Sequence, residues 1–60
     1  MAGKIYIGFE DYRNLTSGIN MAALMAVVDE IKQGKIYILT NGEIENELAL
    51  DENDNIIIKQ

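Results

Sequence analysis

The chain has 60 residues, a net charge of −5 and no Cys or His, and 48% of its residues are hydrophobic. This composition excludes disulfides and a zinc site built on Cys or His, and it argues against disorder. A single domain spanning residues 1–60 buries only about 60% of the surface that its unfolded chain exposes, so oligomerisation is the remaining common source of added stability.

The first two predicted elements are a strand and a long loop. Residues 4–9 alternate between Ile or Phe and Lys, Tyr or Gly, which predicts a strand with its Ile and Phe side chains facing the core. Residues 10–18 are mostly polar and predict a loop that holds Tyr12 and Arg13, residue types enriched at binding hot spots. Two interpretations remain open: the loop is a second partner-binding surface, or Tyr12 packs against the core.

A helix is predicted from residue 19 or 20 to Gln33, because this stretch holds helix formers and no breaker until Gly34. Ser17 or Asn20 is the expected N-cap. A stripe at helical spacing forms the expected core face, and it consists of Leu24, Val27, Val28 and Ile31.

This helix also carries apolar residues outside the core stripe, namely Met21, Ala22, Met25 and Ala26. A helix packed on a sheet buries only one side, so these residues would leave an exposed apolar patch on a monomer. We expect a homodimer that uses them as its interface. The alternative is that Ala serves as a helix former and Met fills gaps in packing.

Three further strands are expected at residues 35–39, 43–50 and 55–59, with Asn41-Gly42 as a hairpin turn. The predicted order is β-α-β-β-β. A right-handed crossover through the helix makes the first two strands parallel. The fold class is therefore α+β, a single small domain with one helix packed on one face of a four-stranded mixed sheet.

The pentapeptide GKIYI occurs twice, at residues 3–7 and 34–38. The segments between and after the two copies do not align, so we interpret the repeat as two similar strand openings. Each copy is expected to direct its Ile side chains inward and its Lys and Tyr side chains outward. Tyr6 and Tyr37 would then share one outer face of the sheet.

Side-chain chemistry also predicts the register of the hairpin. A two-residue Asn41-Gly42 loop would pair Ile38 with Glu45 and place carboxylates among core isoleucines, which is unfavourable. A three-residue loop with a G1 bulge instead pairs Ile38 with Ile44. The expected core side is then formed by Ile36, Ile38, Ile44, Leu48 and Leu50.

Residues 41–55 contain six acidic and no basic residues, so the net negative charge of the chain is concentrated there. Glu43, Glu45 and Glu47 recur at every second position and would share one face of a strand. We expect this acidic face, with the neighbouring Tyr37, to bind a protein that carries a basic surface. The alternative, that the charges only maintain solubility and block edge-to-edge association, remains open.

Catalytic and metal-binding motifs are missing from the sequence. With no His or Cys and a single Ser, the common nucleophile–base pairs cannot form, and we predict a non-enzymatic protein without cofactor or metal. Asp51-x-Asn53-x-Asn55 resembles the start of an EF-hand loop, but Ile56 stands where that loop needs Gly. The few, dispersed basic residues argue against direct nucleic-acid binding, and no apolar run suits a membrane span or a secretory leader.

In size, charge and composition the chain resembles the small acidic inhibitors that bacteriophages encode against host enzymes and anti-phage defence proteins. The resemblance includes no motif, so it assigns no role to any residue. It implies stoichiometric binding in the cytoplasm of a bacterial host, with a nucleic-acid-processing defence complex as the target. The alternatives are a small-molecule-binding or sequestering oligomer, with a ligand at the dimer interface near Tyr6, Tyr37 and Arg13, and a regulatory or structural subunit of a larger assembly.

Overall fold

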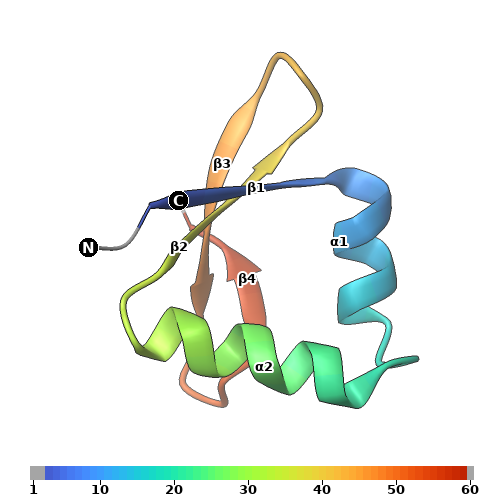
Figure 1. The fold of residues 1–60 in the computed structure, drawn as a ribbon, viewed down its shortest axis with the longest axis vertical. Helices are drawn as coiled ribbons and strands as arrows, with labels where there is room; N and C mark the ends of the chain where they lie inside the picture. The colour runs from blue at the N-terminus through green and yellow to red at the C-terminus, as the bar shows by residue number, and fades with distance from the viewer. Residues whose placement is uncertain (1–2, 60) are drawn as a thin grey trace.

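The computed structural model describes residues 3–59 of the chain (Figure 1). Its elements are β1 (Lys4–Gly8), α1 (Phe9–Thr16), α2 (Met21–Lys32), β2 (Ile36–Thr40), β3 (Glu45–Leu50) and β4 (Ile56–Ile58). The strands form one four-stranded sheet in the order β1-β2-β3-β4, in which β1 is parallel to β2 and the other neighbours are antiparallel. The predicted α+β class with a mixed four-stranded sheet is confirmed.

The structure has a second helix, α1, where the polar sequence predicts a loop over residues 10–18. Glu10 and Asp11 lie in its first turn, where carboxylates interact favourably with the helix dipole. In its last turn the Thr16 hydroxyl donates to the carbonyl oxygen of Tyr12 (2.9 Å). The loop prediction is wrong. Asp, Asn and Thr are weak helix formers, and their presence favours a loop although the apolar residues of this segment recur at helical spacing. That spacing is formed by Phe9, Tyr12 and Leu15.

The helix α2 spans Met21–Lys32, one or two residues inside the start and one inside the end that the sequence predicts. The Asn20 side chain accepts the backbone N–H of Ala23 (3.1 Å) and so caps the first turn. At the other end Gly34 has φ +99°, a conformation that side chains with a Cβ rarely adopt. The N–H of Lys35 then donates to the carbonyl oxygen of Glu30 (3.0 Å), as in a Schellman motif. Gly34 therefore ends α2 and directs the chain into β2.

The two GKIYI copies contribute to neighbouring strands, but they are displaced by one residue. Ile5 is paired with Tyr37, and Tyr6 is paired with Ile38. Because side chains alternate along a strand, this displacement sends the two tyrosines to opposite faces of the sheet. The expectation that Tyr6 and Tyr37 share an outer face is therefore wrong.

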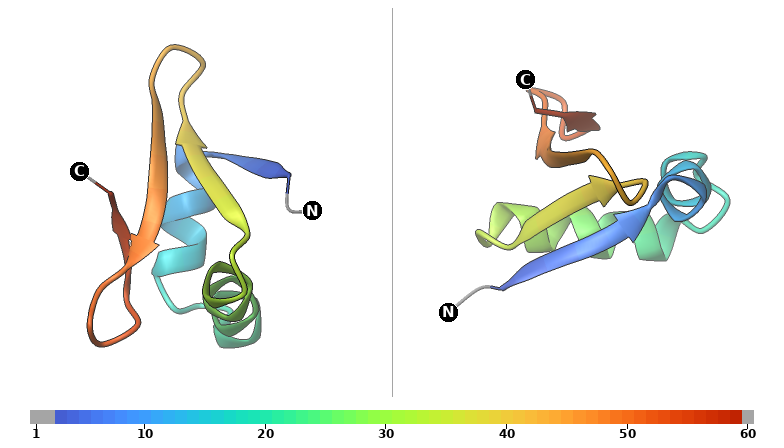
Figure 2. Two further views of the ribbon diagram at one scale, coloured as in Figure 1. Left: turned by 90° about the vertical axis from the view of Figure 1, so that its left-hand side faces the viewer. Right: turned by 90° about the horizontal axis from the view of Figure 1, so that it is seen from above.

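Both helices pack on the same side of the sheet, which is strongly twisted so that β1 runs across the direction of β3 (Figure 2). The core between the helices and the sheet is built on Tyr37, Leu39 and Leu48, against which Ile5, Ile7, Tyr12, Val27, Ile31 and Ile56 pack. Leu48 faces the core as predicted. Ile36 and Ile38 do not, because they alternate with Tyr37 and Leu39 and so face the other side.

The β2–β3 register differs from the predicted one. Thr40 pairs with Glu45, and Ile38 pairs with Glu47. The predicted pairing of Ile38 with Ile44 is therefore wrong. The prediction assumed that Ile38 faces the helices, where a neighbouring carboxylate would lose its water. On the face that the helices leave free, the carboxylates remain hydrated and no such penalty arises.

The turn between β2 and β3 spans residues 41–44 and is organised by the Asn41 side chain. Its Oδ1 accepts the backbone N–H groups of Glu43 (3.0 Å) and Ile44 (2.9 Å), and Gly42 adopts φ +98°. These bonds satisfy the turn locally, in the way that an Asx turn does. Ile44, predicted to lie in the core, is 53% exposed in this turn.

Candidate binding face of the sheet

The face of the sheet that points away from both helices, here termed the open face, is the candidate functional surface. Its residues come from alternate positions of the strands and include Lys4, Tyr6, Ile36, Ile38, Glu45, Glu47 and Ile57. One row across it joins Tyr6 of β1, Ile38 of β2 and Glu47 of β3. Since neighbouring strands lie about 4.8 Å apart, Tyr6 and Glu47 are separated by about 10 Å.

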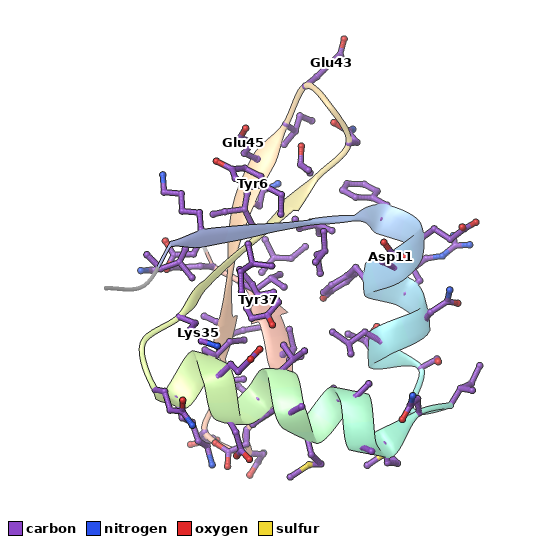
Figure 3. The ribbon with its side chains drawn as sticks, in the orientation of Figure 1. Tyr6, Asp11, Lys35, Tyr37, Glu43 and Glu45 are labelled. Carbon is purple, nitrogen blue, oxygen red and sulfur yellow. The ribbon has the colours of Figure 1, made fainter. Side chains whose placement is uncertain are left out.

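The acidic side chains of the open face lie on and beside β3, between β2 and β4 in the sheet. Glu45 and Glu47 share this face, because they occupy alternate positions of β3. Glu43 precedes β3 and projects from the tip of the β2–β3 turn (Figure 3). Among residues 3–59, Glu47 forms an exposed ion pair with Lys59 (3.5 Å), whereas Glu43 and Glu45 form none. The charges of Glu43 and Glu45 are therefore not neutralised locally.

The centre of the open face is apolar. Ile38 is only 6% exposed although it faces away from both helices. Its neighbours in the row, Tyr6 and Glu47, lie close enough to shield it. Tyr6 itself is 52% exposed and presents its ring to solvent beside this shielded Ile.

Tyr37, which the sequence suggests as a partner-binding residue, lies on the helix side and is buried. Its hydroxyl donates to the carboxylate of Glu30, which also accepts a bond from Nζ of Lys35 (2.9 Å). The bond to Glu30, together with burial, raises the pKa of Tyr37 to about 12. The same bond and that of Lys35 lower the pKa of Glu30. Tyr37 and Lys35 thus connect β2 to α2 (Figure 3), and Tyr37 is not part of the open face.

Tyr12 and Arg13 do not belong to the open face either. Both belong to α1; Tyr12 is half-buried against the core, and Arg13 is exposed. Of the two interpretations left open by the sequence, core packing is therefore the one found for Tyr12. Tyr6, Tyr37 and Arg13 lie on the open face, in the core and on α1, respectively, so the single chain does not bring these three residues together.

The suggested dimer residues lie on the uncovered side of α2. Met21, Ala22, Met25 and Ala26 are all exposed. Met21 and Met25 also line one wall of a groove of ≈ 340 Å³ between α2 and the β3–β4 turn. The apolar surface that the sequence predicts for a lone chain is therefore present.

Asp51, the first residue of the sequence that resembles an EF-hand, has a role inside the β3–β4 turn. Its carboxylate accepts the backbone N–H groups of Asn55 and Asn53 (both 2.8 Å), and these bonds lower the pKa of Asp51. Within residues 3–59 there is no group of three or more side chains that could hold a metal ion. No helix in the same range is long and apolar enough to cross a membrane.

Part of the open face is visible in the sequence. Alternation over residues 4–9 predicts that Tyr6 faces outward, as found. Ile38 is harder to assign, because its neighbours in the sequence fit either face equally well. No protein-family model matches the chain, and the searches of curated proteins and of solved structures found no match. A function therefore has to be argued from the surface itself.

Proposed function

We propose that this chain is a non-enzymatic binding protein whose open face docks onto a basic surface of a larger protein and inhibits it by occupying that surface. The observation that carries the proposal is the placement of Glu45 and Glu47 on the same uncovered sheet face as Tyr6. The proposed inhibition is stoichiometric: one open face binds one basic surface of the target.

The open face has the composition of a protein contact. Tyr is enriched at binding hot spots, and Tyr6 lies beside the shielded Ile38. Glu45 and Glu47 on β3 lie beside this apolar centre, and polar groups surround the apolar centre of many interfaces. Because Glu43 and Glu45 have no local counter-ion among the described residues, they are available to Lys or Arg of a partner.

The target class that we favour is a protein whose basic surface ordinarily holds nucleic acid. Alternate carboxylates on a strand lie roughly 6.6–6.8 Å apart, whereas a DNA strand advances about 3.4 Å of axis per phosphate. Glu45 and Glu47 thus correspond to every second phosphate along the axis, and binding would compete with nucleic acid. The resemblance in size and charge to phage inhibitors supports a nucleic-acid-processing defence complex of a bacterial host as this target.

The test compares two variants that each remove three negative charges. In the first, Glu43, Glu45 and Glu47 are changed to Gln. In the second, which is the control, Glu10→Gln, Asp29→Asn and Glu52→Gln remove exposed charges that lie outside the open face. Tagged wild-type and variant chains are used to capture partners from bacterial lysate at low and high salt, and the affinity of the captured protein is then measured after purification.

We expect wild type and the control to retain the partner at low salt, and the Glu43/Glu45/Glu47 variant to bind at least about tenfold more weakly. High salt should weaken the wild-type complex, because it screens long-range attraction. Nucleic acid that the partner binds should displace the chain. Equal binding by both triple variants, or a salt-insensitive complex, would contradict the proposal.

A further inference from the structure

A groove and a projecting side chain lie next to each other on the helix side of the molecule. The groove, of ≈ 340 Å³, is lined by apolar residues of α2, by Thr16 and by the β3–β4 turn. Its apolar residues are Met21, Leu24, Met25 and Val28. The segment between α1 and α2 begins directly after Thr16, ends at Met21 and projects beyond both helices (Figure 1). Ile19 lies in this segment and is 86% exposed.

Ile19 is held in position, although it is exposed. Its backbone N–H donates to the Ser17 hydroxyl oxygen (3.4 Å), and the preceding Gly18 adopts φ +81°. The following residue, Asn20, is fixed as the N-cap of α2. Hydrogen bonds therefore fix the backbone before and after Ile19, while its large apolar side chain is exposed to water.

We propose that the chain forms a two-fold symmetric homodimer in which Ile19 of each copy inserts into the α2 groove of the other. In a two-fold symmetric contact both copies use the same surface patch, so the patch must contain both the inserting side chain and the groove that accepts it. Ile19 and the α2 groove meet this requirement. The exposed Met21 and Met25 would be covered at the same time. Methionine side chains adapt well to an inserted aliphatic group.

The single chain exposes more surface than a compact monomer of its mass, as expected if part of that surface is covered in a dimer. Its accessible surface is 4362 Å², whereas a compact monomer of its mass is expected to expose about 3,900 Å². The core is thin, since only Val28, Tyr37, Ile38, Leu39 and Leu48 are buried among the described apolar residues. A standard interface covers about 800 Å² on each partner, which is less than a fifth of this surface. A second copy would supply that burial.

Charge favours a second copy at the groove rather than at the open face. Two chains of net charge −5 repel each other, so they should meet where few unpaired charges lie. The groove walls are mainly uncharged, and the carboxylate of Asp54 at its rim is paired with Lys32 (2.7 Å). The open face is not involved, so this inference does not depend on the proposed function.

The test is the oligomeric state of the purified chain over a wide concentration range. Sedimentation equilibrium should show a reversible transition from 6.7 kDa to twice that mass. Ile19→Asp should raise the dimer dissociation constant by at least about thirtyfold, as expected for a hot spot. Because Ile19 is 86% exposed, the substitution should leave the far-UV circular dichroism spectrum unchanged. Ile44→Asp, at a site that is 53% exposed in the β2–β3 turn, is the matched control and should dimerise normally.

A second measurement identifies what fills the groove. In a mixture of isotope-labelled and unlabelled chains, filtered NOEs should connect the Ile19 methyl groups of one copy to the Met25 methyl group of the other. A monomer at every concentration, a dimer unaffected by Ile19→Asp, or intermolecular NOEs confined to other surfaces would overturn the proposal. Dimerisation should persist or strengthen at high salt, whereas partner binding by the open face should weaken. The two proposals can therefore fail separately.

Discussion

Glu30 is the residue that joins the end of α2 to β2. It accepts bonds from Tyr37 and Lys35, which belong to the second GKIYI copy. In the first copy, Tyr6 makes no side-chain hydrogen bond to any residue between 3 and 59 and is exposed. The two tyrosines therefore have different environments. The difference is that Tyr37 has a hydrogen-bond acceptor, the Glu30 carboxylate of α2, whereas Tyr6 has none among residues 3–59.

The Tyr37–Glu30 bond predicts a pH dependence of stability at alkaline pH. Folding raises the pKa of Tyr37 from 10.0 to about 12. The contribution of this group to stability is therefore complete below pH 10 and is lost as the pH rises from about 10 to 12. Tyr37→Phe should lower the free energy of unfolding at neutral pH by about 1 kcal/mol, and it should remove this part of the alkaline loss.

The measurement is urea unfolding at a series of pH values, with absorbance of tyrosinate recorded in parallel. Tyr6→Phe is the matched control, because Tyr6 occupies the same position in the other pentapeptide and is exposed. It should leave the stability at neutral pH unchanged. If Tyr37→Phe and Tyr6→Phe behave alike, the Glu30 bond contributes nothing to stability.

At the scale of elements, the connection from α2 to β2 depends on the backbone of Gly34. A Cβ at this position would meet nothing within 4 Å, so any cost of a side chain comes from φ +99° alone. Gly34→Ala should therefore lower the free energy of unfolding by about 1 kcal/mol. Gly3→Ala, in the other pentapeptide, also has open space around its Cβ and no positive φ. Thermal or urea unfolding should find it neutral, and equal effects of the two substitutions would refute the argument.

Alternation and capping were sufficient to predict most elements. The β1 pattern over residues 4–8, the Asn20 cap and the Gly34 terminator each depend on neighbouring residues, and each is found. Phe9, predicted to end this strand and face the core, instead begins α1 and is 46% exposed. The faces of β2 could not be predicted in this way, because the hydrogen bonds of Glu30 that favour one face come from another element. The sequence does not predict helix α1, because its intrinsic helix propensity is low and contacts with the core stabilise it.

The candidate site was predictable only in part. The spacing of Glu45 and Glu47 is sufficient to place them on one face of a strand. Their neighbours Tyr6 and Ile38 depend on the register of β1, β2 and β3, which involves pairings between distant parts of the sequence. The identity of the two pentapeptides predicts one face for Tyr37 and Tyr6, but the register of β1 and β2 places them on opposite faces.

For the whole molecule, the charge distribution predicts opposite effects of salt on folding and on binding. The isolated chain carries a net charge of −5, and its acidic residues repel one another. Added salt should therefore raise the free energy of unfolding of the isolated chain while it weakens a complex with a basic partner. Urea unfolding at low and high salt measures the first effect, and titration with the purified partner measures the second.

The variant with Gln at positions 43, 45 and 47 is the control for this prediction. Its net charge is −2, since three of the five unbalanced negative charges are removed. Its stability should depend less on salt than that of wild type. A wild-type chain that salt destabilises would show that the ion pairs of Glu30, Glu47 and Asp54 outweigh the general repulsion.

The one-residue displacement of the two GKIYI copies also bears on aggregation. Identical segments stack in register in cross-β fibrils, with like side chains above one another. In this sheet such stacking would place Lys4 beside Lys35 and Tyr6 beside Tyr37, and the observed displacement avoids it. In an unfolded chain the two pentapeptides are no longer held in this displaced register. Each can then pair in register with the same pentapeptide of another molecule, so one chain can pair with two others. Fibril growth from unfolded chains should therefore begin at these pentapeptides.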